Sequence, residues 1–217
     1  LPSLKEIFDV VIAPYKRYVP GKFVVFSPEQ FVSIQEGIIR TYPMKGTIDA
    51  SLPDAEATLL ADIKEQEEHA TVVDLLRNDL SIVSRKVTVD QYRYISKIST
   101  PTKSLLQCSS AISGILEDEF AGKPGSIMHA LLPAGSVTGA PKKKTVELIT
   151  AIELEPRGYY TGVFGVFDGK NLDSAVMIRL IEERGDEYYY RSGGGITYRS
   201  VAEQEYQEIL DKVYIPL

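Results

Sequence analysis

The sequence has little cysteine and little histidine, which limits the chemistry that it can carry. The single cysteine, Cys108, cannot form a disulfide within the chain, and it fits a reducing compartment. The two histidines, His69 and His129, do not have the spacing of metal ligands. The sequence also lacks a Ser/His/Asp arrangement, a Walker loop and a dinucleotide-binding fingerprint. These absences argue against a disulfide scaffold, a histidine-based metal centre and a nucleotide-binding site of those types.

Long apolar runs and an excess of positive charge are also absent. No hydrophobic run is long enough to span a membrane, and no basic start followed by an apolar segment indicates a signal peptide. The 24 Lys and Arg residues are outnumbered by 30 Asp and Glu, which gives a net charge of -6. This charge argues against general binding to nucleic acid phosphates. We therefore predict a cytoplasmic protein that binds neither nucleic acid nor a membrane.

The composition is that of a globular protein with a substantial core. Of the 217 residues, 44% are hydrophobic and 25% are charged. This length favours one domain or a split core, and we predict a single domain over residues 1–217. Helical periodicity alternates along the chain with β-branched and aromatic runs, so the expected class is α+β or mixed α/β.

The residue pattern predicts helices and strands in alternation. Helices are expected within residues 1–18, 54–83, 109–120, 126–135, 141–156 and 200–214. Strands are expected within residues 22–28, 31–43, 86–100, 159–169, 173–183 and 187–197. The second helix should be capped by Asp54 and broken near His69, and the last should begin with a Ser200/Glu203 capping box. Residues 31–43 should form a hairpin that turns at Glu36 and Gly37.

Lys45 stands out because it lies outside any charge cluster. The stretch "TYPMKGTIDAS" places it between Met44 and Gly46, in an extended or turning segment. A glycine beside it leaves the backbone open. A solvated surface lysine is the simple interpretation, and the rest of the sequence has to decide whether it holds.

Two pairs of glutamates have the spacing of one helix face. Glu205 and Glu208 are three residues apart, with Lys212 one turn further, and Glu65 and Glu68 repeat the same spacing. Each pair could be an ordinary solvated face of a helix. Because Mg²⁺ prefers oxygen ligands, the two pairs could instead converge on one magnesium ion.

Three other features could bind an anion. The glycines of "RSGGGIT" follow a predicted strand, where their backbone amides could hold a carboxylate or phosphate, or could form a tight turn. In "SVTGAPK", a helix that starts at Pro141 would direct its unpaired amides outward. Arg179 is a single guanidinium in a predicted apolar strand. Such an arginine requires a carboxylate, either on a ligand or on an internal acidic side chain.

Eight short stretches occur in an informative order between Phe26 and Val213. They are "FSPEQF", "YPMKGT", "EHATVVDLLRNDL", "LLPAGSVTGAPKKKTVELI", "RGYYTGVFG", "DSAVMIRLIE", "SGGGIT" and "EQEYQEILDKV". Together they resemble the chorismate-utilising enzymes, and among them aminodeoxychorismate synthase component I. In this superfamily a lysine in "P-x-K-G-T" marks the aminodeoxychorismate branch, because anthranilate and isochorismate synthases usually have a residue there that is not a nucleophile.

By this resemblance, Lys45 is a covalent nucleophile. Its neutral amine would add to C2 of the chorismate ring while the C4 hydroxyl leaves, and ammonia would then add at C4 and expel the lysine. Hydroxide is a poor leaving group, so a general acid is needed, and Glu29 in "SPE" matches the family residue with that role.

The resemblance also assigns the predicted binding residues. The Mg²⁺ ligands would be Glu68, Glu205 and Glu208, with Glu65 in direct or water-mediated contact, and the ion would bind the ring carboxylate of chorismate. The substrate carboxylates and ring would be held by Gly46, Thr47, Tyr160, Arg179, Gly193, Gly195 and Lys212. These cationic and amide groups suit a dianionic substrate in an acidic protein.

The fold implied by the resemblance is α+β, with two antiparallel β-sheets in a sandwich, helices outside and the active site between the sheets. Members of the family usually carry a further N-terminal region, so we expect this chain to lack the N-terminal part of that fold.

The implied activity is that of a transferase of para-aminobenzoate and folate synthesis, which converts chorismate and ammonia into 4-amino-4-deoxychorismate. A glutamine amidotransferase subunit would supply the ammonia. Two alternatives stay open. One is another chorismate enzyme, an anthranilate or isochorismate synthase, and the other is a catalytically incomplete fragment that binds chorismate.

Overall fold

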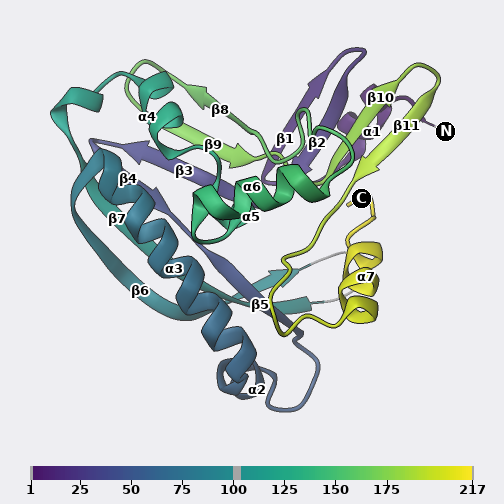
Figure 1. The fold of residues 1–217 in the computed structure, drawn as a ribbon, viewed down its shortest axis with the longest axis horizontal. Coiled ribbons are helices and arrows are strands. Elements are labelled where there is room, and N and C mark those ends of the chain that lie inside the picture. The colour runs from purple at the N-terminus through teal and green to yellow at the C-terminus, as the bar shows by residue number, and fades with distance from the viewer. Residues whose placement is uncertain (1, 100–103, 217) are drawn as a thin grey trace. The chain divides into compact units, whose positions relative to one another are not determined.

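A computed structural model describes residues 2–99 and 104–216 (Figure 1). The helices are α1 (Leu4–Val10), α2 (Ala55–Ala61), α3 (Ile63–Val83), α4 (Pro124–Leu131), α5 (Gly135–Thr138), α6 (Lys142–Ile152) and α7 (Ala202–Asp211), with a 3₁₀ turn at Asp118–Phe120. The strands are β1 (Tyr15–Val19), β2 (Phe23–Ser27), β3 (Gln30–Gln35), β4 (Ile38–Thr41), β5 (Met44–Asp49), β6 (Ser84–Ser99), β7 (Ser104–Leu116), β8 (Val163–Phe167), β9 (Leu172–Val176), β10 (Leu180–Arg184) and β11 (Glu187–Arg191).

The strands form two sheets. The first has four strands in the order β1-β2-β10-β11. The second has seven strands in the order β5-β7-β4-β3-β9-β8, with β6 paired to β7. Every pairing whose register is described is antiparallel. The predicted α+β class with two antiparallel sheets is therefore confirmed.

The chain divides into two compact units. Unit 1 comprises Leu1–Gln30, Arg157–Phe164 and Ala175–Leu217, and unit 2 comprises Phe31–Pro156 and Gly165–Ser174. The four-stranded sheet belongs to unit 1, and the seven-stranded sheet belongs largely to unit 2. The single catalytic domain over residues 1–217 stays a prediction.

The core of unit 1 lies on both faces of its sheet. On one face, Leu4, Ile7 and Val11 of the first helix and its C-cap pack with Val24, Phe26 and Ile181. The other face buries a second cluster, which consists of Phe23, Val25, Met177 and Leu180. Alternate residues of β2 thus contribute to opposite faces, as the pleat of a strand requires.

In unit 2, helix α3 packs against strands β5, β6 and β7 (Figure 1). Its buried apolar residues recur at helical spacing, at Val73, Leu76, Leu80 and Val83. This stripe holds the long helix against the sheet. The packing therefore fixes the orientation of the helix, and with it the direction in which the residues near its N-terminal end project.

The predicted hairpin is confirmed, Asp54 occupies the N-cap of the helical stretch as predicted, and the predicted break near His69 is wrong. Glu36 and Gly37 both have positive φ, as a tight hairpin turn requires. The helical stretch breaks at Asp62, not near His69, because the Asp62 carboxylate accepts the amide of Glu65 at 3.0 Å and caps a new helix. Asp54 makes no side-chain cap, since its own backbone is left-handed, with φ 50°.

The predicted helix over residues 109–120 is also wrong. Most of this segment belongs to β7, which pairs with β4, β5 and β6. Long-range strand pairing overrides a short, ambiguous local pattern here. The expected strand pair over residues 86–100 is one long strand, β6, with three register shifts (Thr100 lies outside the described residues).

Three smaller predictions need correction. Residues 173–183 form parts of two strands, β9 and β10, instead of one. The sequence reading missed β1, which follows the first helix directly. The final helix has Val201 at its N-cap and no side-chain cap, because the Ser200 hydroxyl donates to the Glu205 carboxylate at 2.6 Å.

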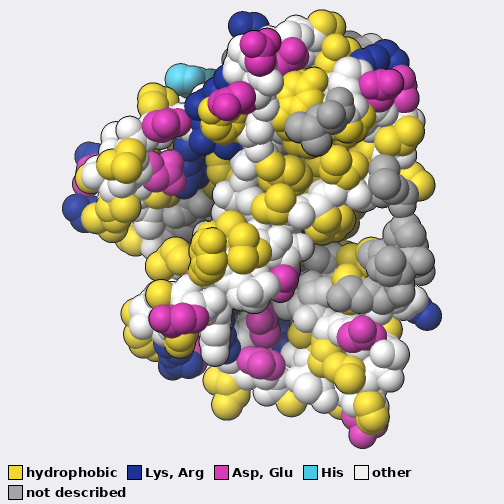
Figure 2. All heavy atoms as spheres, turned by 90° about the vertical axis from the view of Figure 1, so that its right-hand side faces the viewer, with side chains coloured by type: hydrophobic (Ala, Val, Ile, Leu, Met, Phe, Trp, Pro, Cys, Tyr) yellow, Lys and Arg dark blue, Asp and Glu magenta, His cyan; other side chains and the backbone are white. Residues whose placement is uncertain are grey.

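The surface mixes apolar and charged side chains. Figure 2 shows hydrophobic side chains between groups of acidic and basic ones on one face of the molecule. Among the described residues, no helix combines the length and the apolar character needed to cross a lipid bilayer.

A buried ion pair connects α3 to the start of α6 in unit 2. The Lys142 ammonium lies 2.8 Å from both carboxylate oxygens of Asp79 and donates to the Leu131 carbonyl at 3.0 Å. Asp79 is 7% exposed, so loss of its partner would leave a buried charge without compensation.

We predict that Lys142→Met lowers the free energy of unfolding by about 3 kcal/mol, because it leaves the buried Asp79 carboxylate without a positively charged partner. Lys144→Met on the same helix is the matched control, since Lys144 pairs with Glu147 in solvent. The control should change stability by no more than about 0.5 kcal/mol. Urea unfolding of both variants checks this, and equal effects would contradict it.

Candidate active site

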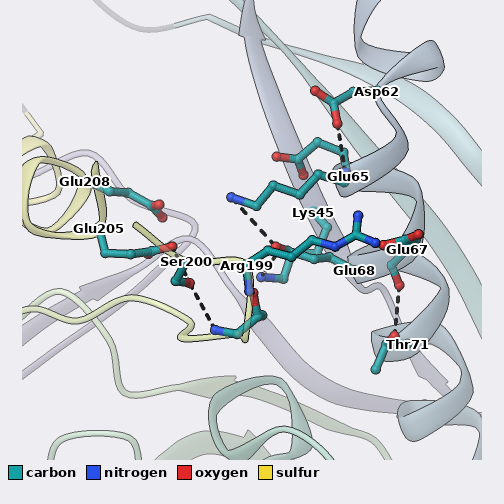
Figure 3. A network of polar contacts seen from close by, with 12 residues as sticks. Lys45, Asp62, Glu65, Glu67, Glu68, Thr71, Arg199, Ser200, Glu205 and Glu208 are labelled. Carbon is teal, nitrogen blue, oxygen red and sulfur yellow. Dashed lines mark hydrogen bonds and ion pairs between the residues drawn. The ribbon is translucent and has the colours of Figure 1, made fainter. Parts of the chain in front are cut away.

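Lys45 lies on β5 beside the first turns of α3 (Figure 3). Its Nζ is 3.3 Å from Oε2 of Glu68, and Nζ of Lys64 is 3.9 Å from the other oxygen of the same carboxylate. The Lys45 side chain is 32% exposed and that of Glu68 is 22% exposed. The structure therefore places Lys45 in a half-buried cluster, and not on an open solvated surface.

This cluster contains a second acid, Glu65. Burial, followed by the neighbouring carboxylates of Glu68 and Asp62, raises the pKa of Glu65. Two carboxylates one helical turn apart repel each other, and a hard divalent cation would relieve that repulsion. The donor chemistry of this pair thus fits the predicted Mg²⁺.

Gly46 fits a tight space next to Lys45. It has φ +83°, a left-handed conformation that favours glycine. A Cβ at this position would lie 2.9 Å from Oε2 of Glu65 and 3.0 Å from Cδ1 of Leu59. The absence of a side chain therefore lets β5 approach the helices closely enough to bring Lys45 to the glutamates.

A buried hydrogen bond fastens the same turn of α3 to the sheet. Nε2 of His69 lies 2.6 Å from Oγ of Ser110 on β7, and both residues are fully buried. Burial, with the positive charges of Arg93 and Lys45, lowers the pKa of His69 to about 4. His69 is therefore neutral at neutral pH and contributes a fixed contact next to Glu68.

In unit 1, Glu205 and Glu208 project from the same side of α7 (Figure 3). Glu205 is only 7% exposed and accepts the Ser200 hydroxyl at 2.6 Å. Glu208 accepts the Lys212 ammonium at 2.5 Å. Their predicted place on one helix face is confirmed. The described residues contain no group of three or more His, Cys, Asp or Glu side chains that could hold a metal ion, so the Mg²⁺ site stays a prediction.

The glycine-rich turn after β11 is packed against two predicted site elements of unit 1. A Cβ on Gly193 would lie 2.7 Å from the Tyr160 hydroxyl, and one on Gly194 would lie 3.5 Å from Oε2 of Glu205. The carbonyl of Gly193 also accepts the Lys212 ammonium at 3.4 Å. These contacts bring Tyr160, Lys212 and the glycine-rich segment together, and their role in holding a carboxylate stays a prediction.

Arg179 lies between β9 and β10, where it has φ +57°, and the prediction that it lies within an apolar strand is wrong. Its Nη1 donates to the Lys212 carbonyl at 2.6 Å, and its guanidinium lies 4.9 Å from the centroid of the Tyr214 ring. No Asp or Glu in the described part of the chain forms an ion pair with it. A backbone carbonyl and an aromatic face thus hold the guanidinium, in place of the internal carboxylate that was considered.

The remaining predicted residues lie on a strand or in segments next to strands and helices. Glu29 follows β2 in unit 1, where its amide donates to the Ser27 hydroxyl at 3.1 Å and its carbonyl accepts the amide of Val176. Thr47 lies on β5 and is exposed, and Gly195 follows Gly194 in the exposed glycine-rich turn. Pro141 occupies the N-cap of α6, not its first helical position, and Lys142 at the start of this helix is engaged by Asp79.

A family model described as "chorismate binding enzyme" matches residues 4–217. The chain belongs to this family. The match covers nearly all of the present chain, and it includes both units and every predicted site residue.

Individual relatives carry several names. The chain is 54% identical to an uncharacterized PabA-like protein of Pasteurella multocida, over 99% of this chain and 66% of the relative. It is 38% identical to an anthranilate synthase component 1 of Haloarcula marismortui (95% and 44%), and 34% identical to aminodeoxychorismate synthase component 1 of Bacillus subtilis (97% and 46%). The chain thus spans about two thirds of the first relative and less than half of the other two.

A solved structure has the same fold. The crystal structure of anthranilate synthase component I from Streptococcus pneumoniae aligns with a TM-score of 0.80 and 33% identity, over 96% of this chain and 47% of that one. The likeness supports the predicted architecture of this chorismate binding enzyme, and it covers about half of the solved chain.

Sequence reasoning missed one buried acid in this chorismate binding enzyme. Glu182 on β10 is buried, and its Oε2 accepts from Nε of Arg191 at 3.0 Å and from Nη2 of Arg184 at 2.9 Å. Arg191 is the last residue of β11 and stands just before the glycine-rich segment. The ion pair between Glu182 and Arg191 therefore anchors the start of that segment. The available signal was an acid, Glu182, directly after the apolar residues of "VMIRLIEE".

We predict that Gly46→Ala destabilises the protein by at least about 2 kcal/mol, because the new methyl group meets Glu65 and Leu59 as well as an unfavourable φ. Gly37→Ala is the matched control: it has φ +77° but nothing within 4 Å of the added Cβ. The control should cost only about 1 kcal/mol, from backbone strain alone. Thermal unfolding compares the two, and equal losses would show that the space beside Gly46 is not tight.

Proposed function

We propose that this chorismate binding enzyme converts chorismate and ammonia into 4-amino-4-deoxychorismate through a covalent intermediate on Lys45. The observation that carries the proposal is the position of Lys45 within "P-M-K-G-T" on β5, 3.3 Å from Glu68 and next to the tightly packed Gly46. Relatives include both anthranilate and aminodeoxychorismate synthases, so family membership alone leaves the branch open. The presence of a lysine at position 45 favours the aminodeoxychorismate branch, because its amine can act as the nucleophile.

In the proposed first step, the lone pair of Lys45 Nζ forms a bond to C2 of the ring. The ring double bonds shift and the C4–O bond breaks. The departing hydroxyl takes a proton from Glu29 and leaves as water, while the new secondary amine loses a proton. Only a neutral amine has the lone pair for this attack, so the ammonium of Lys45 must lose a proton before the C2–N bond forms.

In the proposed second step, ammonia adds to C4. The double bonds shift back, the C2–N bond breaks, and Lys45 is regenerated as a free amine after proton transfer. The net reaction consumes chorismate and ammonia and produces 4-amino-4-deoxychorismate and water. The two shifts of the ring double bonds connect C2 with C4. Attack of Lys45 at C2 can therefore lead to amination at C4.

Binding of the dianionic substrate is assigned to the residues that match the family's positions. Arg179 and Tyr160 would hold the enolpyruvyl carboxylate, and Gly46 and Thr47 would line the ring. The amides of Gly193 and Gly195, with the Lys212 ammonium, would receive the ring carboxylate. The observed contacts of Tyr160 and Lys212 with Gly193 support this grouping.

We assign the Mg²⁺ ligands to Glu68, Glu205 and Glu208, with Glu65 as a further contact. When bound, the ion would neutralise the ring carboxylate and withdraw electrons from the diene. These glutamates fit such a cation because their oxygen donors are of the type that Mg²⁺ prefers. Burial, followed by the neighbouring carboxylate of Glu68, raises the pKa of Glu65, and a bound cation would offset that unfavourable setting.

Ammonia is proposed to come from a glutamine amidotransferase subunit, and the pathway is proposed to be para-aminobenzoate and folate synthesis in the cytoplasm. The similarity to aminodeoxychorismate synthase component 1 supports both assignments. The relatives are longer than this chain, so the assignments concern the activity of the whole protein.

We expect Lys45→Ala to lower the rate of aminodeoxychorismate formation by several orders of magnitude, because it removes the nucleophile. Lys64→Ala is the matched control: it removes the other ammonium next to Glu68 and should keep the rate within about threefold. Product analysis with chorismate, Mg²⁺ and ammonium salt measures both.

Other outcomes of this assay separate the rival functions. Anthranilate or isochorismate as the product of the unaltered protein would identify another branch of the family. Thermal stabilisation by chorismate with no product would identify a binding fragment. Aminodeoxychorismate formation at an undiminished rate by the Lys45→Ala variant would refute the covalent mechanism.

For the metal, we expect Glu68→Gln and Glu205→Gln each to weaken Mg²⁺ binding by at least about tenfold, because each removes a charged ligand. Glu203→Gln is the control on the same helix as Glu205, since Glu203 is exposed on the first turn of α7. Isothermal titration with Mg²⁺ measures the affinity without turnover. Equal affinities in all variants would remove these glutamates from the metal site.

A further inference from the structure

Arg93 has an unusual backbone in the middle of β6. It has φ +52°, a left-handed conformation that is costly for a residue with a Cβ. It lies where the pairing of β6 with β7 shifts register, between Gln91 and Tyr94. Such a bulge redirects a side chain out of the regular alternation of the strand. Strain of this kind persists only where surrounding contacts hold it.

The backbone of Arg93 is linked to the turn of α3 that carries Glu68. Its amide donates to Oγ of Ser110 at 2.9 Å, and the same oxygen lies 2.6 Å from Nε2 of His69. His69 directly follows Glu68 in the sequence. One buried hydroxyl thus connects the bulge to the helix turn beside Lys45.

The side chain of Arg93 reaches the end of α2. Its Nη2 donates to the carbonyls of Leu60 at 3.0 Å and Leu59 at 3.4 Å. These carbonyls belong to the last turn of a helix, where backbone acceptors have no partner within the helix. The guanidinium therefore caps α2 at the point where the chain turns into α3.

The end of α2 also packs against Gly46, the residue that follows Lys45. Leu59 is buried, and its Cδ1 lies 3.0 Å from the Cβ position of Gly46. The Leu60 carbonyl also accepts Nε2 of Gln66 at 2.8 Å, which closes the junction from the α3 side. Displacement of the junction between α2 and α3 would therefore move the helical residues that pack against β5.

We propose that Arg93 is a positioning residue that fixes the junction of α2 and α3, and with it Glu65 and Glu68, relative to Lys45. It acts through two arms, the amide bonded to Ser110 and the guanidinium bonded to the α2 carbonyls. The effect on turnover rests on the proposed function, whereas the effect on the junction does not.

An arginine suits this position for a geometric reason. A planar guanidinium presents several donors in a rigid fork and can serve two adjacent carbonyls, whereas an ammonium is a flexible point donor. We therefore expect Arg93→Lys to restore part of what Arg93→Ala loses. Ser110→Ala should affect the other arm, because it removes the hydroxyl shared by Arg93 and His69.

The test compares Arg93→Ala with Arg85→Ala, a control on the same strand whose guanidinium pairs with Glu117 at the surface. Backbone hydrogen exchange reports the junction without substrate. We expect exchange of residues 59–68 to become at least about tenfold faster in Arg93→Ala, with α4 and β4 unchanged, and no such change in Arg85→Ala. If Arg93→Ala does not fold, Arg93→Gly removes the guanidinium while accommodating the positive φ.

The second readout is the kinetics of aminodeoxychorismate formation. We expect kcat of the Arg93 variants to fall about 10- to 100-fold with a smaller change in KM, since misplacement of reacting groups lowers the rate of chemistry. Faster exchange at the junction in a protein that never forms this product would sustain the positioning role and contradict the proposed function. Unchanged exchange at residues 59–68, or equal effects of Arg93→Ala and Arg85→Ala, would overturn the positioning role.

Discussion

The hydrogen bond between His69 and Ser110 fixes the long helix α3 to its sheet at the turn where the candidate chemistry lies. Both side chains are fully buried, and the low pKa of His69 keeps the imidazole neutral, so the contact carries no charge that would need compensation. With this turn held, Glu68 reaches Lys45 on β5, and Gly46 allows the strand to approach. The position of the Lys45 amine thus follows from how the helix and the sheet are joined.

Lys45 illustrates how an acidic protein can hold a basic group at a defined place. The carboxylate of Glu68 lies 3.3 Å from the amine and orients it. Because family members carry the names of both anthranilate and aminodeoxychorismate synthases, the common fold leaves the branch open, and the proposed role of Lys45 as a nucleophile is what separates the possibilities.

Much of the fold and the candidate site could be predicted from local patterns. The turn at Glu36 and Gly37 and the shared face of Glu205 and Glu208 follow from short-range rules. Strand β7 could not be predicted in this way, because its identity depends on pairing with β4 and β5, which are distant in the sequence, as well as with its neighbour β6. The role of Arg93 was equally hidden, since neither a bulge nor its hydrogen bonds to α2 leave a simple periodic signal.

The most direct measurement is peptide mass spectrometry of the protein incubated with chorismate and Mg²⁺ in the absence of ammonia. The account predicts that the peptide containing Lys45 gains the mass of chorismate less one water, and that addition of ammonia removes this adduct and releases 4-amino-4-deoxychorismate. Release of that product while Lys45 stays unmodified, or an adduct on Lys64 in its place, would contradict the account.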